Sequence, residues 1–583
     1  METQLEIYID CNKNSFKGGR HMKKNIAENS IRVFFIVLFT SVFLLFLVAN
    51  GLMQKSNNAG NVIDIDKNVL FQINDKQPQK VNLSEYSFDF PEVGDTITIT
   101  AVLPDTYVSQ PVMMLNVYHS TVEVFLDGKN IYQYGQDLFK KGYTLGHGNF
   151  RIPLSDKYQG KELKIQLTVT EKDSYSSLEP IYIINSSESY THLITDHFLT
   201  FMSSLTLITI GVVGLIASLS RKKYDRDTRT LTWISWFAIG MSVWMLCNDC
   251  LIYLIVPNFQ MASIMEYYGV YTTVIPVALF FANAQSNMRY RNIFLGCAIF
   301  MIAANIVITV MHLCGGVHYI FWVPYIQIVM ILLILFIIYT LFRSYRNESN
   351  QRVLTYGMIF MGFVVFFELI RFNLYKYLNG LFPISLSLMP IGTLIFVSSM
   401  IYSYCIKIIE SYHDRAEQEF LEKLAYMDML TNIFNRNKCE KIIDDMEEQR
   451  QPGYLINFDL NGLKYVNENF GHTQGDILLK NFSEILRKTF QEKGIVGRMG
   501  GDEFLAVMYE VEENKVKDVL TNLDENITLW NTKHPDDKIS VSYGYAYYNG
   551  EKHVKLRNVY EQADVHMYEY KKEIKKRDGI PCR

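Results

Sequence analysis

The apolar residues of the chain fall into long uncharged runs, a stretch that alternates with period two, and a mixed stretch. The first run, 33–53, has 21 residues without a charge, which at about 1.5 Å per residue covers the hydrocarbon core of a bilayer. Seven further runs follow Asp196, and they are 198–220, 231–251, 264–284, 293–313, 320–342, 353–375 and 381–406. The pattern predicts an all-α membrane bundle of one plus seven helices.

The charges in the loops between these runs predict the orientation of the bundle. Ten Lys and Arg residues fall in one set of loops and only Lys376 in the other. The basic loops are 221–229, 285–291 and 343–352, and the others are 257–261, 314–319 and 376–380. By the positive-inside rule the basic loops, the tail 1–32 and the C-terminal region face the cytoplasm. We expect the first run to be an uncleaved anchor, with cleavage after Ala49 as the alternative.

Residues 54–196 alternate between apolar and polar positions, for example at Val122, Val124 and Leu126, with turn signals such as Asp127-Gly128. This period predicts half-buried strands, and we expect an extracytoplasmic β-sandwich of jelly-roll type that acts as a sensor. We expect its aromatic residues Tyr118, Tyr132 and Tyr134 to be exposed, where they could stack on a sugar ring or another small solute. Ordinary sheet packing is the alternative.

Polar residues interrupt two of the later runs. Glu368 and Arg371 lie three positions apart and can pair on one helix face, and Glu266 lies near the outer end of its run. These residues indicate either a switch or small ligand cavity, or a structural ion pair and an interfacial acid. Cys247 and Cys250 are expected to be free thiols, with a disulfide as the alternative.

Composition excludes several classes of protein. The net charge of −4 across 583 residues, with an isoelectric point near 6.3, gives no electrostatic case for a nucleic-acid binder. The eight cysteines are scattered, so they indicate neither a disulfide framework nor a zinc-ligand array.

A polar connector, 407–424, follows the last run and keeps an apolar stripe with helical spacing. The stripe consists of Ile409, Tyr412, Ala416, Phe420 and Leu424. It predicts an amphipathic signalling helix that pairs with its twin in a homodimer, or alternatively lies on the domain that follows.

From residue 425 to 583 the chain predicts an α/β domain. The β-rich segments are 454–458, 497–499, 504–508 and 539–547, and the helical ones are 436–448, 475–490, 513–528 and 558–576. The most specific feature is Gly500-Gly501-Asp502-Glu503-Phe504 between two short strands, because two glycines form a tight turn without side chains and two carboxylates follow at once. Asp459 ends another apolar strand.

Three motifs in this domain agree in order and spacing: DMLTNIFNR from Asp428, INFDLNGLKYVNENFGHTQGD from Ile456, and the glycine-rich pentapeptide. On these motifs residues 425–583 resemble a GGDEF-type diguanylate cyclase, which implies a nucleotidyl-cyclase-like fold with a central, mainly antiparallel sheet. The layout of an outer β-sandwich followed by seven spans, at 197–406, resembles bacterial seven-transmembrane receptors with diverse intracellular signalling modules.

The resemblance implies roles for individual residues. Asp459, the carbonyl of Leu460, Asp502 and Glu503 would hold two Mg²⁺ or Mn²⁺ ions per site, and Asp502 would accept the proton of the attacking hydroxyl. Carboxylates and phosphates are ligands that Mg²⁺ prefers. The further candidates for binding substrate GTP are Asn467 and Asp476 on guanine, Gly500 and Gly501 in the turn, and Lys464, Lys571 and Lys575 on phosphate, with a solvated surface charge as the alternative for each lysine.

The chain departs from the family pattern in places. Asn461 replaces a frequent second acid, Glu468 stands where aspartate is frequent, and Gln491 and Gly494 replace the Arg and Asp of the family's product-inhibition site. Without that arginine and its partner carboxylate, we expect no inhibitory site.

Together these patterns predict a membrane receptor that makes cyclic di-GMP from two GTP, works as a homodimer and responds to an unknown small extracytoplasmic ligand, for which a carbohydrate is one candidate. The alternatives are a catalytically silent receptor that binds GTP or a protein partner, and a transporter with a regulatory tail.

Overall fold

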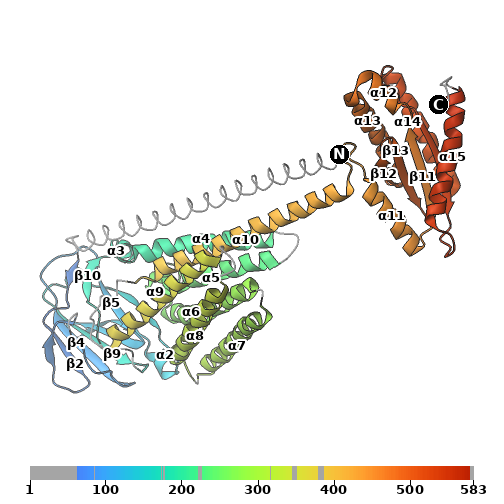
Figure 1. Cartoon of the computed structure of the whole chain (residues 1–583). Helices are drawn as coiled ribbons and strands as arrows, with labels where there is room; N and C mark the ends of the chain where they lie inside the picture. The colour runs from blue at the N-terminus through green and yellow to red at the C-terminus, as the bar shows by residue number, and fades with distance from the viewer. Residues whose placement is uncertain are drawn as a thin grey trace. The chain divides into compact units, whose positions relative to one another are not determined.

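The computed structural model describes residues 62–577, except 84–85, 173, 175–176, 221–225, 286, 316, 345–350 and 378–386. The chain divides into two compact units, Met1–Ile409 and Glu410–Arg583, and each is described by itself. Figure 1 labels their helices and strands. The predicted tail 1–32 and anchor 33–53 lie outside the described residues.

The first unit begins with two facing antiparallel sheets. One has the order β1-β10-β5-β8 and the other the order β3-β2-β4-β9-β6-β7. The strands are β1 Ile63–Asp64, β2 Val69–Ile73, β3 Gln79–Val81, β4 Thr96–Val102, β5 Pro111–Tyr118, β6 Ser120–Leu126, β7 Lys129–Tyr134, β8 His147–Pro153, β9 Glu162–Val169 and β10 Tyr182–Asn185. Alternate residues such as Ile97 and Ile99 of β4 are buried in the core between the sheets. The two-sheet domain agrees with the period-two pattern, while the jelly-roll topology stays a prediction.

The three tyrosines proposed as exposed sugar-stacking residues are half-buried instead. Tyr118 donates a hydrogen bond to Glu179 at 2.9 Å and stacks on a histidine ring, and Tyr134 donates to the Leu145 carbonyl at 2.9 Å. Tyr132 packs edge-on against Phe150. Because these contacts occupy the rings, the expectation of exposed aromatics was wrong.

Seven helices in the described part of the chain are long and apolar enough to cross a membrane, and each contains most of one predicted run. They are α4 Phe198–Leu219, α5 Arg226–Asn248, α6 Phe259–Ala284, α7 Met288–Leu313, α8 Val323–Ser344, α9 Gln351–Tyr377 and α10 Met389–Tyr426. The shorter helices η2 Leu251–Leu254 and η3 Tyr319–Trp322 lie between α5 and α6 and between α7 and α8. Two others belong to the chain before α4: α2 Gln136–Lys140 follows β7, and α3 Ser189–Asp196 directly precedes α4. Length and composition thus describe a multi-pass membrane protein.

The predicted pair of Glu368 and Arg371 is present, with 2.7 Å between Oε2 and Nε. The other oxygen of Glu368 accepts hydrogen bonds from Ser387 Oγ at 2.9 Å and from the Leu388 backbone N–H at 2.6 Å. The carboxylate therefore binds the chain directly before α10, and the favoured interpretation, a structural ion pair, agrees with these contacts.

The last span and the connector form one continuous helix, α10. On its connector half, Ile409 and Tyr412 are 44% and 62% exposed, and Phe420 and Leu424 are also exposed. The amphipathic pattern therefore leaves an apolar stripe on the helix surface.

The second unit contains one four-stranded antiparallel sheet of order β12-β13-β11-β14. Its strands are β11 Gly453–Leu460, β12 Ile495–Gly500, β13 Glu503–Tyr509 and β14 Val541–Tyr548, and its helices are α11 Arg436–Gln449, α12 Leu463–Phe470, α13 His472–Phe490, α14 Glu513–Lys533 and α15 Leu556–Arg577. The fully buried central strand β11 shares one face with α13 and α14 and the other with α11 and α15. The predicted α/β fold with an antiparallel sheet is confirmed.

Candidate active site

Side chains alternate between the two faces of the sheet along β11, and this alternation decides to which face the Asp459 side chain points. Asn457 and Leu455, two and four positions earlier on β11, face α15, and the Asn457 amide donates to the Tyr560 carbonyl of that helix at 3.3 Å. Asp459 therefore points to the same side. There Lys571 of α15 donates a hydrogen bond from Nζ to Asp459 Oδ1 at 2.6 Å, in an ion pair whose side chains are 25% and 12% exposed.

The glycine-rich pentapeptide forms the predicted turn between β12 and β13. Gly501 has φ +54° and Gly500 has φ +149°, conformations that favour glycine over residues with a Cβ. The register places Glu503 of β13 directly opposite Asp459 of β11, and the Leu460 N–H donates to the Asp502 carbonyl at 2.9 Å. Directly opposed residues on antiparallel strands project from the same face of a sheet, with Cβ atoms about 5 Å apart.

Arg498 holds this turn in place. Its Nη2 and Nε donate to the Gly501 carbonyl at 2.8 and 3.1 Å, and its Nη1 lies 3.3 Å from Asp428. Thr431 also donates to Asp428, and although burial opposes ionisation, these hydrogen bonds and Arg498 lower the pKa of Asp428. The sequence motif contained Asp428 without indicating this role, which depends on a contact 70 residues along the chain.

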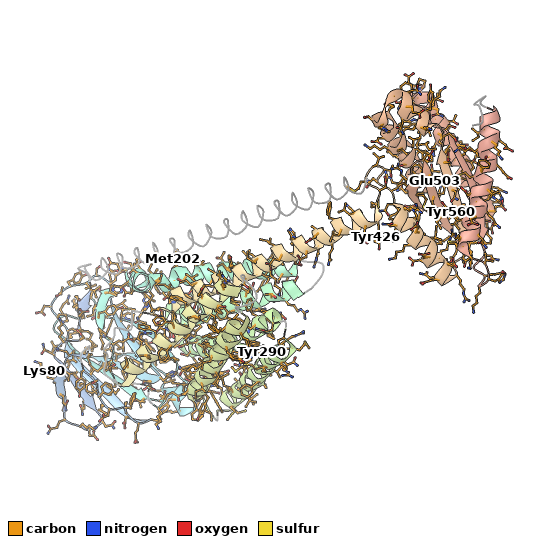
Figure 2. The ribbon with its side chains drawn as sticks, viewed as in Figure 1. Lys80, Met202, Tyr290, Tyr426, Glu503 and Tyr560 are labelled. Atoms are coloured by element: carbon orange, nitrogen blue, oxygen red, sulfur yellow. The ribbon has the colours of Figure 1, made fainter. Side chains whose placement is uncertain are left out.

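Negative charge gathers around Glu503. Burial, and then the carboxylates of Asp502, Asp564 and Asp459, raise the pKa of Glu503. Asp564 was not among the residues singled out from sequence, although it lies seven positions before Lys571 on α15 and so on the same helix face. Burial, followed by Glu503 and Asp564, raises the pKa of Tyr560 to about 12. Figure 2 labels Glu503 and Tyr560 in this unit.

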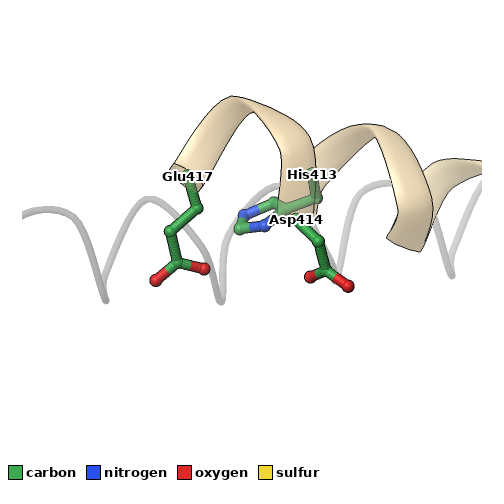
Figure 3. A group of neighbouring side chains, drawn as sticks. All are labelled: His413, Asp414 and Glu417. Carbon is green, nitrogen blue, oxygen red and sulfur yellow. The ribbon is translucent and has the colours of Figure 1, made fainter. Parts of the chain in front are cut away.

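The donor set fits hard divalent cations. The side chains offer carboxylate oxygens, which Mg²⁺ and Mn²⁺ prefer, and a protein cation, Lys571, already contacts one of them. The oxygens of Asp459, Asp502 and Glu503 are not all within 4.8 Å of one another. Among the described residues, the one group that meets this criterion is His413, Asp414 and Glu417 of α10 (Figure 3), far along the sequence from the GGDEF turn.

The two guanine candidates lie on adjacent helices. Asn467 of α12 is half-buried and Asp476 of α13 is exposed, and the sharp link between the helices uses Gly471 at φ +84°. The Asn467 carboxamide packs directly on Gly475, where a methyl group would lie 2.9 Å from its Cγ and would overlap its oxygen. A side chain at position 475 would therefore displace the Asn467 amide.

The three lysine candidates differ in position. Lys571 lies at the carboxylates, as described above. Lys464 is 88% exposed and its Nζ lies 3.9 Å from Glu468, which agrees with a surface charge. The side chain of Lys575 lies outside the described residues.

The structure describes both positions that correspond to the family's product-inhibition site, 491 and 494. Gln491 is exposed directly after α13, and Gly494 precedes β12. A Cβ at Gly494 would lie 2.8 Å from the Val507 carbonyl oxygen and 3.2 Å from the Phe490 ring. An aspartate would not fit at position 494 without movement of the backbone.

With this geometry described, the family of the C-terminal unit can be stated. Residues 425–577 match the family "Diguanylate cyclase, GGDEF domain", and this part of the chain is a GGDEF domain. A relative from Escherichia coli strain K12, "Probable diguanylate cyclase DgcT", is 28% identical over 156 residues, which cover 26% of this chain and 34% of the relative. "Uncharacterized membrane protein SERP0413" of Staphylococcus epidermidis is 29% identical over 184 residues, 31% of this chain and 51% of that protein.

Two solved structures are also similar to part of this chain. The chain is 28% identical to the one described as "A Novel Interaction Mode between a Microbial GGDEF Domain and the Bis-(3, 5)-cyclic di-GMP", with a TM-score of 0.23 and coverage of 26% of this chain and 94% of that one. A second, "Crystal Structure of the coiled coil and GGDEF domain of DgcB from Caulobacter crescentus in complex with c-di-GMP", is 22% identical, with a TM-score of 0.26 and coverage of 30% and 95%. The matched regions span a third to about half of the curated relatives' lengths.

Proposed function

We propose that the chain is a membrane-bound receptor diguanylate cyclase that condenses two GTP into cyclic di-GMP and releases two pyrophosphates. The observation that carries the proposal is the convergence of Asp459, Asp502 and Glu503 at the end of β11 and the neighbouring turn, with Lys571 on Asp459. The clustered charges are those needed to hold divalent cations and a triphosphate, and the family of the domain supports the same reaction.

In the proposed reaction, the 3′-hydroxyl of one GTP attacks the α-phosphorus of the other. Asp502 accepts the proton of that hydroxyl, and Asn467 with Asp476 hydrogen-bonds guanine, where a carboxylate can accept from the N1 and N2 hydrogens that adenine lacks. Divalent cations bound by Asp459, the Leu460 carbonyl, Asp502 and Glu503 would neutralise charge on the phosphates. Lys571 reaches the same place and can bind a phosphate oxygen when it leaves Asp459.

One GTP per active site requires two domains that face each other, so the proposed protein works as a homodimer. The exposed stripe of α10, which includes Ile409 and Tyr412, is the surface we propose for pairing of the connector helices. The basic loops support a cytoplasmic GGDEF domain and an outer sandwich, through which an extracytoplasmic signal changes how the two domains meet.

The test is formation of cyclic di-GMP from GTP by the full chain in lipid nanodiscs, with Mg²⁺ or Mn²⁺, followed by chromatography. The Asp502→Ala variant should lose at least about a hundredfold in rate, because the proton acceptor and a metal ligand are removed together. The matched control is Asp518→Ala, which removes an exposed aspartate of α14. A chain that binds GTP yet makes no product with either metal would instead support the silent receptor.

A further inference from the structure

Within the first unit, the sandwich contacts the helical bundle through the residues around the start of β8. The His147 backbone N–H donates to Ser263 Oγ of α6 at 2.9 Å, and the Tyr253 hydroxyl donates to the His147 carbonyl. A methyl group at Gly146 would lie 2.5 Å from the Phe259 carbonyl oxygen. We call this contact the docking interface. On the sandwich side it consists of residues 142–150 with His119 and Glu171, and on the bundle side of Tyr253 in η2, the first part of α6 and the residues at the start of η3.

Aromatic packing extends the docking interface. The Phe259 ring, at the start of α6, stacks on Phe150 of β8 with centroids 4.1 Å apart and meets Tyr134 edge-on at 5.5 Å. A Cβ at Gly148 would overlap the same Phe259 ring. The sandwich and the bundle therefore fit closely here, and separation would expose apolar area as well as polar groups.

Two ion pairs join the sandwich to the bundle, and each uses a histidine in place of lysine or arginine. His147 Nδ1 lies 3.1 Å from Glu266 Oε2 of α6, with 8% and 14% of the side chains exposed. His318, directly before η3, pairs with Glu171 after β9, and its Nε2 lies 3.2 Å from the Gly142 carbonyl oxygen. Imidazole is the side chain whose charge changes near neutral pH, so both pairs can be switched on and off by protons.

A third histidine contacts the bundle without a carboxylate. Nε2 of His119, which is 3% exposed, lies 2.9 Å from the Tyr267 hydroxyl of α6, and its Nδ1 lies 3.5 Å from Thr144 Oγ1. Its neighbours offer hydrogen bonds but no negative charge in direct contact. This site suits a neutral imidazole.

We propose that the docking interface is a proton-sensing site, in which His147 and His318 fasten the sandwich to the membrane bundle when protonated and His119 does so when neutral. The ligand is the proton of the outer medium. The chemistry that recognises it is two histidine–carboxylate pairs and one histidine–tyrosine hydrogen bond, all at the same contact.

The surrounding groups raise the pKa values of His147 and His318 and lower that of His119. Burial disfavours charge on His147, but Glu266, together with Cys250, raises its pKa well above the ordinary value of 6.5. The hydrogen bond to Glu171 raises the pKa of His318, against the effect of burial. The ring of another titratable residue, His312 of α7, faces His318 with centroids 5.5 Å apart. Burial, with the nearby His147 and His318, lowers the pKa of His119 to about 3.

These directions give the sign of the pH dependence. Above pH 6.5, docked His147 and His318 keep protons that the separated forms have lost, so docking weakens as pH rises through their raised pKa values. Below pH 6.5, separated His119 binds a proton that docked His119 excludes, so docking weakens again toward acid. Each such proton changes the docking equilibrium by up to about tenfold per pH unit, and docking is tightest near pH 6.5.

For the cyclase, the inference rests on the proposed function: a change of docking alters the outer end of the bundle, whose last helix, α10, continues into the connector. The regulatory statement is that outside pH changes the rate of cyclic di-GMP formation. The interface itself does not depend on catalysis, and its test is separate.

The experiment measures hydrogen–deuterium exchange of the full chain in nanodiscs from about pH 5 to about pH 9, corrected for the intrinsic pH dependence of exchange. Amides of residues 145–150 should be most protected near pH 6.5 and lose protection on both sides. In His147→Gln with His318→Gln, which keeps amide donors but no titratable charge, the alkaline loss should disappear. In Glu266→Gln, which keeps His147 but removes its partner's charge, the alkaline loss should become smaller, because only the His318–Glu171 pair still contributes to it.

The matched control is His192→Gln, because His192 pairs with Asp196 inside the single helix α3, at 2.7 Å. Its protection profile should equal that of the parent. Equal protection at every pH in the parent, or an alkaline loss of unchanged size in Glu266→Gln, overturns the proton-sensing site. In sealed vesicles with buffered interiors, product formation that ignores outside pH overturns the regulatory statement alone, and absence of product at every pH overturns the proposed function.

Discussion

Replacement of Gly475 by alanine should weaken GTP binding by the GGDEF domain without lowering its stability. Gly475 is buried within α13, and its φ is not in the left-handed region, so alanine can adopt its backbone conformation. Alanine in place of glycine inside a helix contributes up to about 1 kcal/mol. The folded domain should therefore not lose stability through its backbone.

The added methyl group would clash with the Asn467 side chain. It would overlap the carboxamide oxygen and lie 2.9 Å from Cγ, and because these atoms belong to a flexible side chain, the amide moves rather than the helix. If Asn467 hydrogen-bonds guanine, loss of that bond costs about 0.5–1.5 kcal/mol, which corresponds to an increase of about two- to tenfold in KM for GTP. The value of kcat should change little, since Asp459, Asp502 and Glu503 are on other elements.

The assay compares steady-state cyclic di-GMP formation and thermal unfolding for the parent, Gly475→Ala, Asn467→Ala and the double variant. Both single variants should raise KM by the same factor, and the double variant should add nothing further, because the two changes remove one contact. An unchanged KM in Gly475→Ala, or additive effects in the double variant, would refute the assignment of Asn467 to guanine.

Three further predictions concern other parts of the chain. Restoring the family's inhibitory pair with Gln491→Arg and Gly494→Asp should lower the melting temperature and leave product inhibition absent. The reason is that a Cβ at position 494 would lie 2.8 Å from a backbone oxygen, so the aspartate does not fit. Tight inhibition by added product in a cyclase assay would contradict this prediction. Because the pKa of Glu503 is raised, its carboxylate form is lost as pH falls through a value above 4.5, and kcat/KM should fall in the same pH range. A higher Mg²⁺ concentration should move that fall to lower pH, because the metal binds the carboxylate form. A pH profile that does not change with Mg²⁺ would count against metal binding by Glu503. Gly148→Ala should increase exchange of residues 145–150 at every pH by overpacking against Phe259, and equal exchange would show that the interface adapts.

Local patterns in the sequence were enough to predict the seven apolar helices and the α/β domain, and the resemblance to GGDEF cyclases implied that its sheet is antiparallel. Each of the seven apolar runs after Asp196 lies mostly in one helix, because a span depends only on its own length and composition. The glycine pair predicted the turn that carries Asp502 and Glu503, because the requirement for φ near +54° at Gly501 acts within two residues. The expectation of exposed aromatics at Tyr118, Tyr132 and Tyr134 failed because the exposure of a strand residue depends on what packs against its sheet.

Only the tertiary structure decided which distant residues meet. Lys571 contacts Asp459 across 112 residues, and His147 contacts Glu266 from a strand to a membrane helix. Such contacts follow from strand register and from which helix face covers the sheet, and neither has a local signature in the chain. The sequence thus determined the elements and the chemical groups they carry, while packing decided that acidic oxygens face a lysine at one end of a sheet and that histidines join the sandwich to the bundle.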